Sequence, residues 1–260
     1  MTSSISLKNW LKIAAAMVLL PILWACSEQA PDYGEARTAA MDEAAASPGY
    51  RRINTPNPDD PLAAHIYELD NGLRVYLTEN HEEPRFYAEI AVRAGSKHDP
   101  ADATGLAHYL EHLLFKGNRN LGTLDYEAER PHLERIVELY EQHFAETNPE
   151  RRAEIYAEIN QVAQQAAEYA IPNEIDKLYN SMGASGLNAH TWHEETVYKV
   201  SLPSNRLEQW ALIESDRFIN PVFRLFHTEL ETVYEEKNRT LDNPGRVIAT
   251  AVDELLYKVH

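Results

Sequence analysis

The chain is organised around the motif H-Y-L-E-H at residues 108–112, which lies in a largely apolar run, 106–115, that contains no glycine. Successive residues of a helix are turned by about 100°, so the side chains of His108, Glu111 and His112 leave the same face. Two imidazoles one turn apart can both reach a single ion at about 2.0 to 2.1 Å, which is how a helix supplies two protein ligands of a catalytic zinc ion. The motif therefore predicts a helix with His108 and His112 as zinc ligands.

Glu111 would stand beside the open position of such an ion. A carboxylate there suits a general base that takes a proton from zinc-bound water, whose pKa the metal lowers to about 7. The order H-x-x-E-H is the inverted form of the commoner zinc-protease helix. A solvated helix face that happens to carry two histidines is the alternative, and a third ligand would separate the two interpretations.

The best candidate for that ligand lies in a polar helical stretch, residues 228–239. Glu229 and Glu236 are seven residues apart in it, which is two helical turns, so their carboxylates share a face. A charged outer face of a helix would also explain both residues. Glu229 and Glu236 therefore indicate a metal site only in combination with the histidine motif.

The histidine motif followed by the pattern E-x-x-x-V-x-x-E, from Glu229 to Glu236, resembles the pitrilysin/insulysin family of inverted-motif zinc peptidases. The resemblance implies that Glu236 is the third ligand of one zinc ion per chain, beside His108 and His112. It also implies that Glu111 is the general base and that Glu229 is an accessory carboxylate near the site.

Two shorter phrases add to the resemblance, L-F-K-G at 114–117 and N-A-H-T at 188–191. In the family, the strand at the second phrase is an edge strand beside the zinc, on which a peptide substrate is thought to lie. Main-chain hydrogen bonds would hold any extended peptide there. The resemblance thus implies a metalloendopeptidase for peptides or unfolded proteins, with Asn188 and Ala189 lining the substrate.

The N-terminus has the composition of a secretory signal. Residues 1–25 contain two lysines and no acidic residue. Their apolar run, 13–25, is too short to span a bilayer. We therefore expect residues 1–25 to be a signal peptide that the mature protein lacks.

Cys26 ends the phrase L-W-A-C, which resembles the cleavage box of bacterial lipoproteins, where the cysteine becomes the lipidated first residue. It is the only cysteine in the sequence and cannot form an internal disulfide, so a lipid-bearing role suits an exported chain. Ser27 rather than aspartate follows it, which favours the outer membrane of the bacterial cell envelope, facing the periplasm. A free thiol in an uncleaved anchor is the alternative.

The chain is acidic, with a formal net charge of −17 at pH 7. Nothing in it resembles the basic footprint of a nucleic-acid-binding protein, so we expect no nucleic-acid partner. A negative surface would steer neutral or basic peptides towards the protein.

Residues 26–61 are rich in alanine, proline, serine and acidic residues and have no apolar periodicity, so we expect a flexible tether to the membrane. The folded zinc-peptidase domain is expected over 62–260. It begins with a hairpin, in which strands at 65–69 and 73–77 flank the turn signal D-N-G, and a third strand follows at 86–94.

Two runs of apolar residues at helical spacing, 133–144 and 155–166, are separated by a Thr-Asn-Pro break. They predict an antiparallel pair of helices, inserted over about 124–176. The insertion would explain why Glu236 follows His112 by 124 residues, a longer gap than is usual in the family. The sequence leaves open whether the pair is a lid or only packing.

These elements predict an α/β fold, a two-layer sandwich of an antiparallel or mixed sheet backed by helices, with the helical hairpin as an insertion. An apolar helical stripe at 247–256 is followed at residue 260 by the end of the sequence, without the residues that usually close a helix. Family members place a second domain of similar fold after the zinc domain. The resemblance therefore implies that a C-terminal domain or partner chain completes the enzyme, and that this chain alone cleaves peptides poorly.

Two other functions are compatible with parts of the pattern. A non-catalytic zinc-binding or scaffold lipoprotein would keep the motif and lack the catalytic partner domain. A substrate-binding lipoprotein without metal would leave the spacing of Glu229 and Glu236 unexplained. Metal analysis, followed by peptide cleavage with and without a chelator, would separate all three functions.

Overall fold

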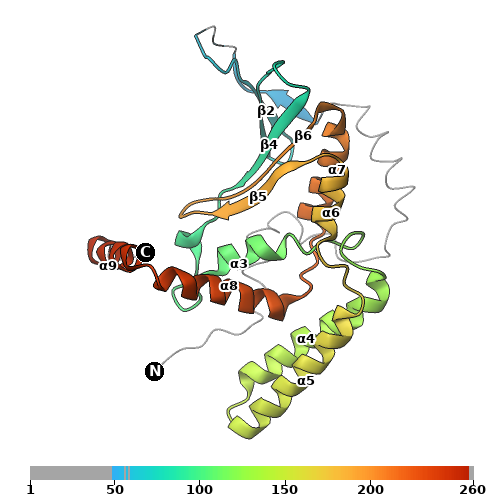
Figure 1. Cartoon of the computed structure of the whole chain (residues 1–260), viewed down its shortest axis with the longest axis vertical. Helices are drawn as coiled ribbons and strands as arrows, with labels where there is room; N and C mark the ends of the chain where they lie inside the picture. The colour runs from blue at the N-terminus through green and yellow to red at the C-terminus, as the bar shows by residue number, and fades with distance from the viewer. Residues whose placement is uncertain (1–48, 56, 58, 258–260) are drawn as a thin grey trace. The chain divides into compact units, whose positions relative to one another are not determined.

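The computed structural model describes residues 49–55, 57 and 59–257 (Figure 1). The expected signal peptide, 1–25, lies outside the described residues, as do Cys26 and most of the expected tether. The structure therefore bears on the folded part of the chain.

The described residues form two compact units, with the boundary between Pro84 and Arg85. The boundary falls inside the span 62–260, which we expected to fold as one domain. Among the described helices, none is both long and apolar enough to cross a bilayer.

The first unit contains a three-stranded antiparallel sheet in the order β1-β2-β3, formed by Tyr50–Arg52, His65–Leu69 and Arg74–Leu77. The predicted hairpin is confirmed, because β2 pairs with β3 and Gly72 has the left-handed φ of +85° that suits its turn. The tether prediction is corrected for residues 50–52, which pair with β2. All three are exposed, so β1 lacks the apolar alternation that reveals a strand in a sequence.

The second unit contains a three-stranded antiparallel sheet in the order β4-β6-β5, formed by Arg85–Val92, Thr196–Pro203 and Ser185–Thr191. The strand expected at 86–94 is present as β4, and all of its residues pair with β6. β6 is the central strand, and β5 lies at an edge (Figure 1).

Two helices pack on one face of this second sheet. α6, Glu174–Ser181, and α7, Leu207–Ile219, share an apolar core with β4 and β6. Tyr179 of α6 and Leu202 of β6 are fully buried in that core, and Trp210 of α7 packs against it. An antiparallel sheet backed by helices confirms the predicted α/β fold.

The predicted helical insertion is confirmed as well. Figure 1 shows α4, Tyr126–Ala145, and α5, Pro149–Ala167, side by side as a long hairpin. Leu139, Ile155 and Ile159 form the buried cluster between the two helices.

Two further helices form the framework of the candidate site. α3, Leu106–Leu113, and α8, Phe226–Leu241, meet through a buried cluster of Tyr109, Leu113 and Val233 (Figure 1). The Tyr109 hydroxyl also donates to the main-chain oxygen at the first residue of α8. The other described helices are α9, Pro244–Leu256, and the short 3₁₀ turns η1, Ser96–His98, and η2, Ser204–Arg206.

Candidate metal centre

α3 presents both histidines of the motif on one face, as the sequence predicts. The ring centroids of His108 and His112 are 4.9 Å apart. The start of the helix is held by Asp99, whose carboxylate accepts the main-chain N–H groups of Gly105 at 2.7 Å and Ala107 at 2.9 Å. These bonds satisfy donors that a helix leaves free at its N-terminus, so a residue well before the helix replaces the usual capping side chain.

α8 brings Glu236 to the two histidines. Its Oε2 atom lies 3.5 Å from Nε2 of His108 and 3.5 Å from Nε2 of His112. Two ligand atoms that each lie about 2.0 to 2.1 Å from a tetrahedral ion are about 3.3 to 3.4 Å apart, so this donor set fits zinc. Among the described residues, these three form the one group of candidate ligands found within 4.8 Å of one another.

His112 is oriented by Glu229, whose Oε2 lies 3.4 Å from Nδ1 of the imidazole. Glu229 is itself held by Lys116, whose Nζ lies 2.6 Å from Oε1. A histidine that donates from Nδ1 to a carboxylate keeps the lone pair of Nε2 available, which is the usual support of a zinc-binding histidine. The accessory carboxylate suggested by the sequence therefore lies where it can fix the tautomer of one ligand.

The same contacts change the acidity of both groups. The hydrogen bond to Glu229 raises the pKa of His112 above its ordinary value. Burial opposes the ionisation of Glu229, yet the hydrogen bonds from His112 and Lys116 outweigh it, and the pKa of Glu229 is lowered. A metal ion must compete with a proton for His112, so binding is expected to release that proton.

Glu111 lies on the same face of α3 and is only 7% exposed. Its Oε2 accepts a hydrogen bond of 2.6 Å from the hydroxyl of Thr191. Thr191 in turn lies 3.3 Å from the hydroxyl of Thr196, which donates to the main-chain oxygen of Ala94. Sequence reasoning missed Thr191, although it is the last residue of the N-A-H-T phrase.

The predicted substrate residues lie on the edge strand β5. Asn188 pairs with Lys199 of β6, and Ala189 pairs with Tyr198. The side chain of Asn188 is exposed, whereas Ala189 is partly buried and shares its side of the strand with Thr191. β5 therefore links the edge of the sheet to the carboxylate of Glu111.

Parts of this chain are similar in sequence to known proteases. Residues 74–131, which include the histidine motif, match the model of the insulinase family, peptidase family M16. The probable zinc protease PqqL of Haemophilus influenzae is 38% identical over 63 residues, which cover 24% of this chain and 7% of that protein. Protease 3 of Escherichia coli K12 is 29% identical over 175 residues, which cover 67% of this chain and 15% of that protein.

A solved structure of the first half of the periplasmic protease PqqL from Escherichia coli gives a TM-score of 0.49 at 21% identity, covering 76% of this chain and 33% of that one. The matched part of the chain covers only 7% of the length of PqqL from Haemophilus influenzae and 15% of the length of Protease 3. The stretch that matches the family model, 74–131, nevertheless contains both histidines and Glu111. One of the two relatives is named a probable zinc protease and the other a protease. Over residues 74–131, the chain is similar to the insulinase family of peptidases, family M16.

Proposed function

We propose that this chain is the zinc-binding part of a metalloendopeptidase, in which His108, His112 and Glu236 hold one zinc ion and Glu111 is the general base. The observation that carries the proposal is the cluster of two imidazole nitrogens and one carboxylate oxygen, each histidine nitrogen lying 3.5 Å from the oxygen. A zinc ion held there would lower the pKa of a coordinated water towards about 7 and polarise the scissile carbonyl.

Glu111 would move the proton. Its Oε2 atom accepts the hydrogen bond of the Thr191 hydroxyl, which orients the carboxylate, and Oε1 would receive the proton of the attacking water. A carboxylate so placed accepts the water proton as the new C–O bond forms and returns it to the departing amine. Glu229 takes no proton in this scheme and keeps His112 in its ligating tautomer.

The edge strand β5 supports a peptide as the substrate. Its outer main-chain groups can pair with an extended peptide, and such pairing is independent of the peptide's sequence. The formal charge of −17 favours neutral or basic peptides. We therefore propose peptides or unfolded proteins as the substrate class, with Asn188 and Ala189 along the binding strand.

The whole enzyme is proposed to include a C-terminal domain or partner chain of similar fold. The side chains of His108 and Glu236 are each 39% exposed, so water has access to the ligand cluster. A facing domain would exclude that water and strengthen the electrostatic stabilisation of the reacting groups. On this view, the chain alone binds zinc but cleaves peptides poorly.

Attachment through Cys26 to the outer membrane, facing the periplasm, is the remaining part of the proposal. It rests on the phrase L-W-A-C and on Ser27. The precursor should be lipidated in cells, and Cys26→Ser should leave a soluble or uncleaved form. Fractionation of cells labelled with a radioactive fatty acid tests this, and a soluble, unlabelled wild type would contradict it.

Zinc content and peptide cleavage together test the proposed function. The purified chain should retain about one zinc ion after dialysis, and an active form that includes the facing domain should cleave an unstructured peptide in a chelator-sensitive reaction. Bound zinc without any cleavage by the extended form would favour the non-catalytic zinc-binding lipoprotein. A chain that binds no zinc would contradict both.

A further inference from the structure

We propose that Arg224 and Glu129 are positioning residues of the zinc site, and that the helical hairpin is present to hold α8 against α3. The inference rests on the proposed function, because it takes Glu229 and Glu236 of α8 as parts of that site. It assigns the hairpin a scaffold role through one buried ion pair.

Arg224 lies just before α8, and its side chain is 2% exposed, while that of Glu129 is not exposed at all. The guanidinium of Arg224 donates to both carboxylate oxygens of Glu129, at 2.9 and 3.0 Å. It also donates to the main-chain oxygens of Lys116 at 2.8 Å, Asn118 at 2.9 Å and Leu121 at 3.0 Å. These contacts use all five N–H donors of the side chain, which is an unusually complete set for one arginine.

The groups that Arg224 joins come from three segments. Glu129 lies in the first turn of α4, the three carbonyls belong to the loop that directly follows α3, and Arg224 itself leads into α8. The same junction contains Leu225, which caps α8 in a left-handed conformation with φ of +54°. A residue with a side chain adopts that conformation only where its surroundings hold it, and the bonds of Arg224 supply that restraint.

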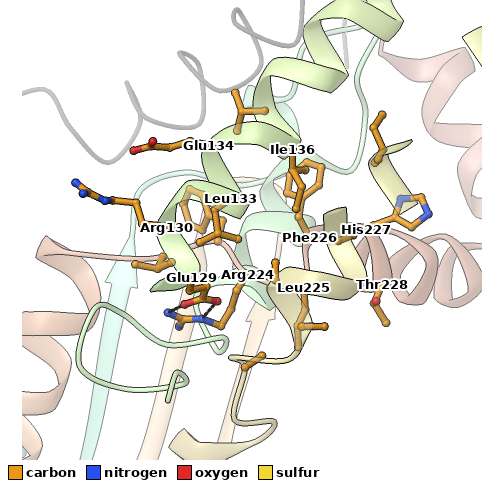
Figure 2. Close-up of a pocket in the computed structure, with 18 of the residues that line it drawn as sticks. Glu129, Arg130, Leu133, Glu134, Ile136, Arg224, Leu225, Phe226, His227 and Thr228 are labelled. Atoms are coloured by element: carbon orange, nitrogen blue, oxygen red, sulfur yellow. Dashed lines mark hydrogen bonds and ion pairs between the residues drawn. The ribbon is translucent and has the colours of Figure 1, made fainter. Parts of the chain in front are cut away.

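A cavity of about 610 Å³ lies between the hairpin and the start of α8 (Figure 2). Its walls are largely apolar and include Leu133, Ile136 and Phe226. Beside the ring contact of Tyr140 with Phe226, two sets of polar contacts join the hairpin to α8 and the residues just before it. One is the ion pair of Glu129 and Arg224. The other is His227, whose Nδ1 lies 2.9 Å from the hydroxyl of Tyr140 and whose Nε2 lies 2.9 Å from that of Tyr156, so that one ring nitrogen donates and the other accepts.

The position of α8 is critical because Glu236 lies ten residues beyond its first residue, Phe226. At about 1.5 Å per residue, the ligand is about 15 Å from the start of the helix, so a tilt of about 4° there moves it by about 1 Å. A ligand atom displaced that far can no longer complete a zinc site at normal bond lengths. The ion pair thus holds the start of α8, where a small tilt of the helix produces a large displacement of the Glu236 carboxylate.

The test compares zinc affinity, by chelator competition, in the full chain and three variants. Glu129→Gln keeps the shape and removes the charge. Glu129→Leu combined with Arg224→Met removes both charges and leaves no unpaired ion to prevent folding. Glu214→Gln is the matched control, because Glu214 and Arg217 form a similarly buried pair, 6% and 1% exposed, whose two members both lie in α7. The further hydrogen bond of Glu214 comes from Tyr179 of α6 and not from α3 or α8.

Zinc affinity should fall about tenfold or more in both Glu129 variants, the range found when outer partners of metal ligands are removed, and should change much less in Glu214→Gln. Cobalt in place of zinc should show the weaker absorption of a site that has lost one protein ligand. Amide hydrogen exchange of residues 226–236 in the metal-free chain should become faster in the Glu129 variants only.

Equal zinc affinity and equal exchange in the wild type and both Glu129 variants would overturn the inference, as would an equal loss in Glu214→Gln. A wild type that binds no zinc would instead contradict the proposed function. The exchange of residues 226–236 would then still decide whether the ion pair fixes α8.

Discussion

The α4–α5 hairpin and the α3–α8 pair are joined by different kinds of contact. In the hairpin, Leu139 and Ile159 are completely buried, and Ile155 is 5% exposed. The α3–α8 pair also has an apolar cluster, around Val233, and in addition it is joined by contacts among histidine, lysine and glutamate side chains. The hairpin thus has a buried apolar core, whereas the α3–α8 pair combines an apolar core with a cluster of ionisable groups.

The two kinds of contact have opposite energetic consequences. Burial of one leucine or isoleucine contributes about 1.5 to 3 kcal/mol, so the hairpin adds to the stability of the fold. The carboxylates of Glu229 and Glu236 lie beside two histidines, and Lys116 pairs with Glu229, so a bound cation would add the charge that pairs with Glu236. Mutations should therefore separate stability from metal binding, depending on which pair of helices they change.

The largest expected effect is on catalysis, from Glu111→Gln in an active form of the protein. The change removes the proton acceptor and keeps the shape, so the rate should fall about 10²- to 10⁴-fold while zinc stays bound. Peptide turnover and zinc content measured on the same samples check this. Loss of zinc in Glu111→Gln would indicate that Glu111 is a ligand and would contradict its proposed role as the base.

Zinc affinity should respond next most strongly, to Glu236→Gln. Replacement of a charged ligand by a neutral amide should weaken binding by more than about 10²-fold, the upper range for partners that only support a ligand. Glu235→Gln is the matched control, because it makes the same chemical change at the neighbouring position. Tight binding by Glu236→Gln together with weak binding by Glu235→Gln would show that the ligand has been assigned to the wrong residue.

A smaller effect on catalysis is expected from Thr191→Val, which removes the hydroxyl that orients Glu111. kcat should fall about tenfold, a barrier increase of about 1.4 kcal/mol, with KM little changed, because the peptide still pairs with β5. Thr191→Ser restores a hydroxyl and should recover most of the activity. An equal loss of activity in the serine variant would mean that the threonine acts through packing.

The same comparison explains what the sequence could predict. The hairpin is specified by local signals, namely apolar residues at helical spacing and a Thr-Asn-Pro break, and the histidine motif likewise lies within one turn of one helix. The contacts that complete the site join residues far apart in the chain, such as Thr191 with Glu111 and Arg224 with Glu129. No spacing in the sequence encodes such pairs, so only the fold reveals them.

The smallest effect is expected from Asn148→Ala at the tip of the hairpin, a change that should alter stability and leave zinc binding unchanged. The Asn148 side chain caps α5 by accepting the main-chain N–H groups of Glu150 and Arg151 at 2.9 and 3.1 Å. Loss of the cap should lower the free energy of unfolding by about 1 kcal/mol, measured by chemical denaturation. Asn148→Asp keeps an accepting oxygen and should be close to neutral.

Zinc affinity should not change in Asn148→Ala, although the variant loosens the same hairpin that is proposed to hold α8. The tip of the hairpin lies away from α8 in Figure 1, whereas Glu129 lies in the first turn of α4, where the buried ion pair forms. Fraying at the tip therefore leaves the bonds of Arg224 intact. Weaker zinc binding in Asn148→Ala would show that the whole hairpin, rather than the ion pair at its base, sets the position of Glu236.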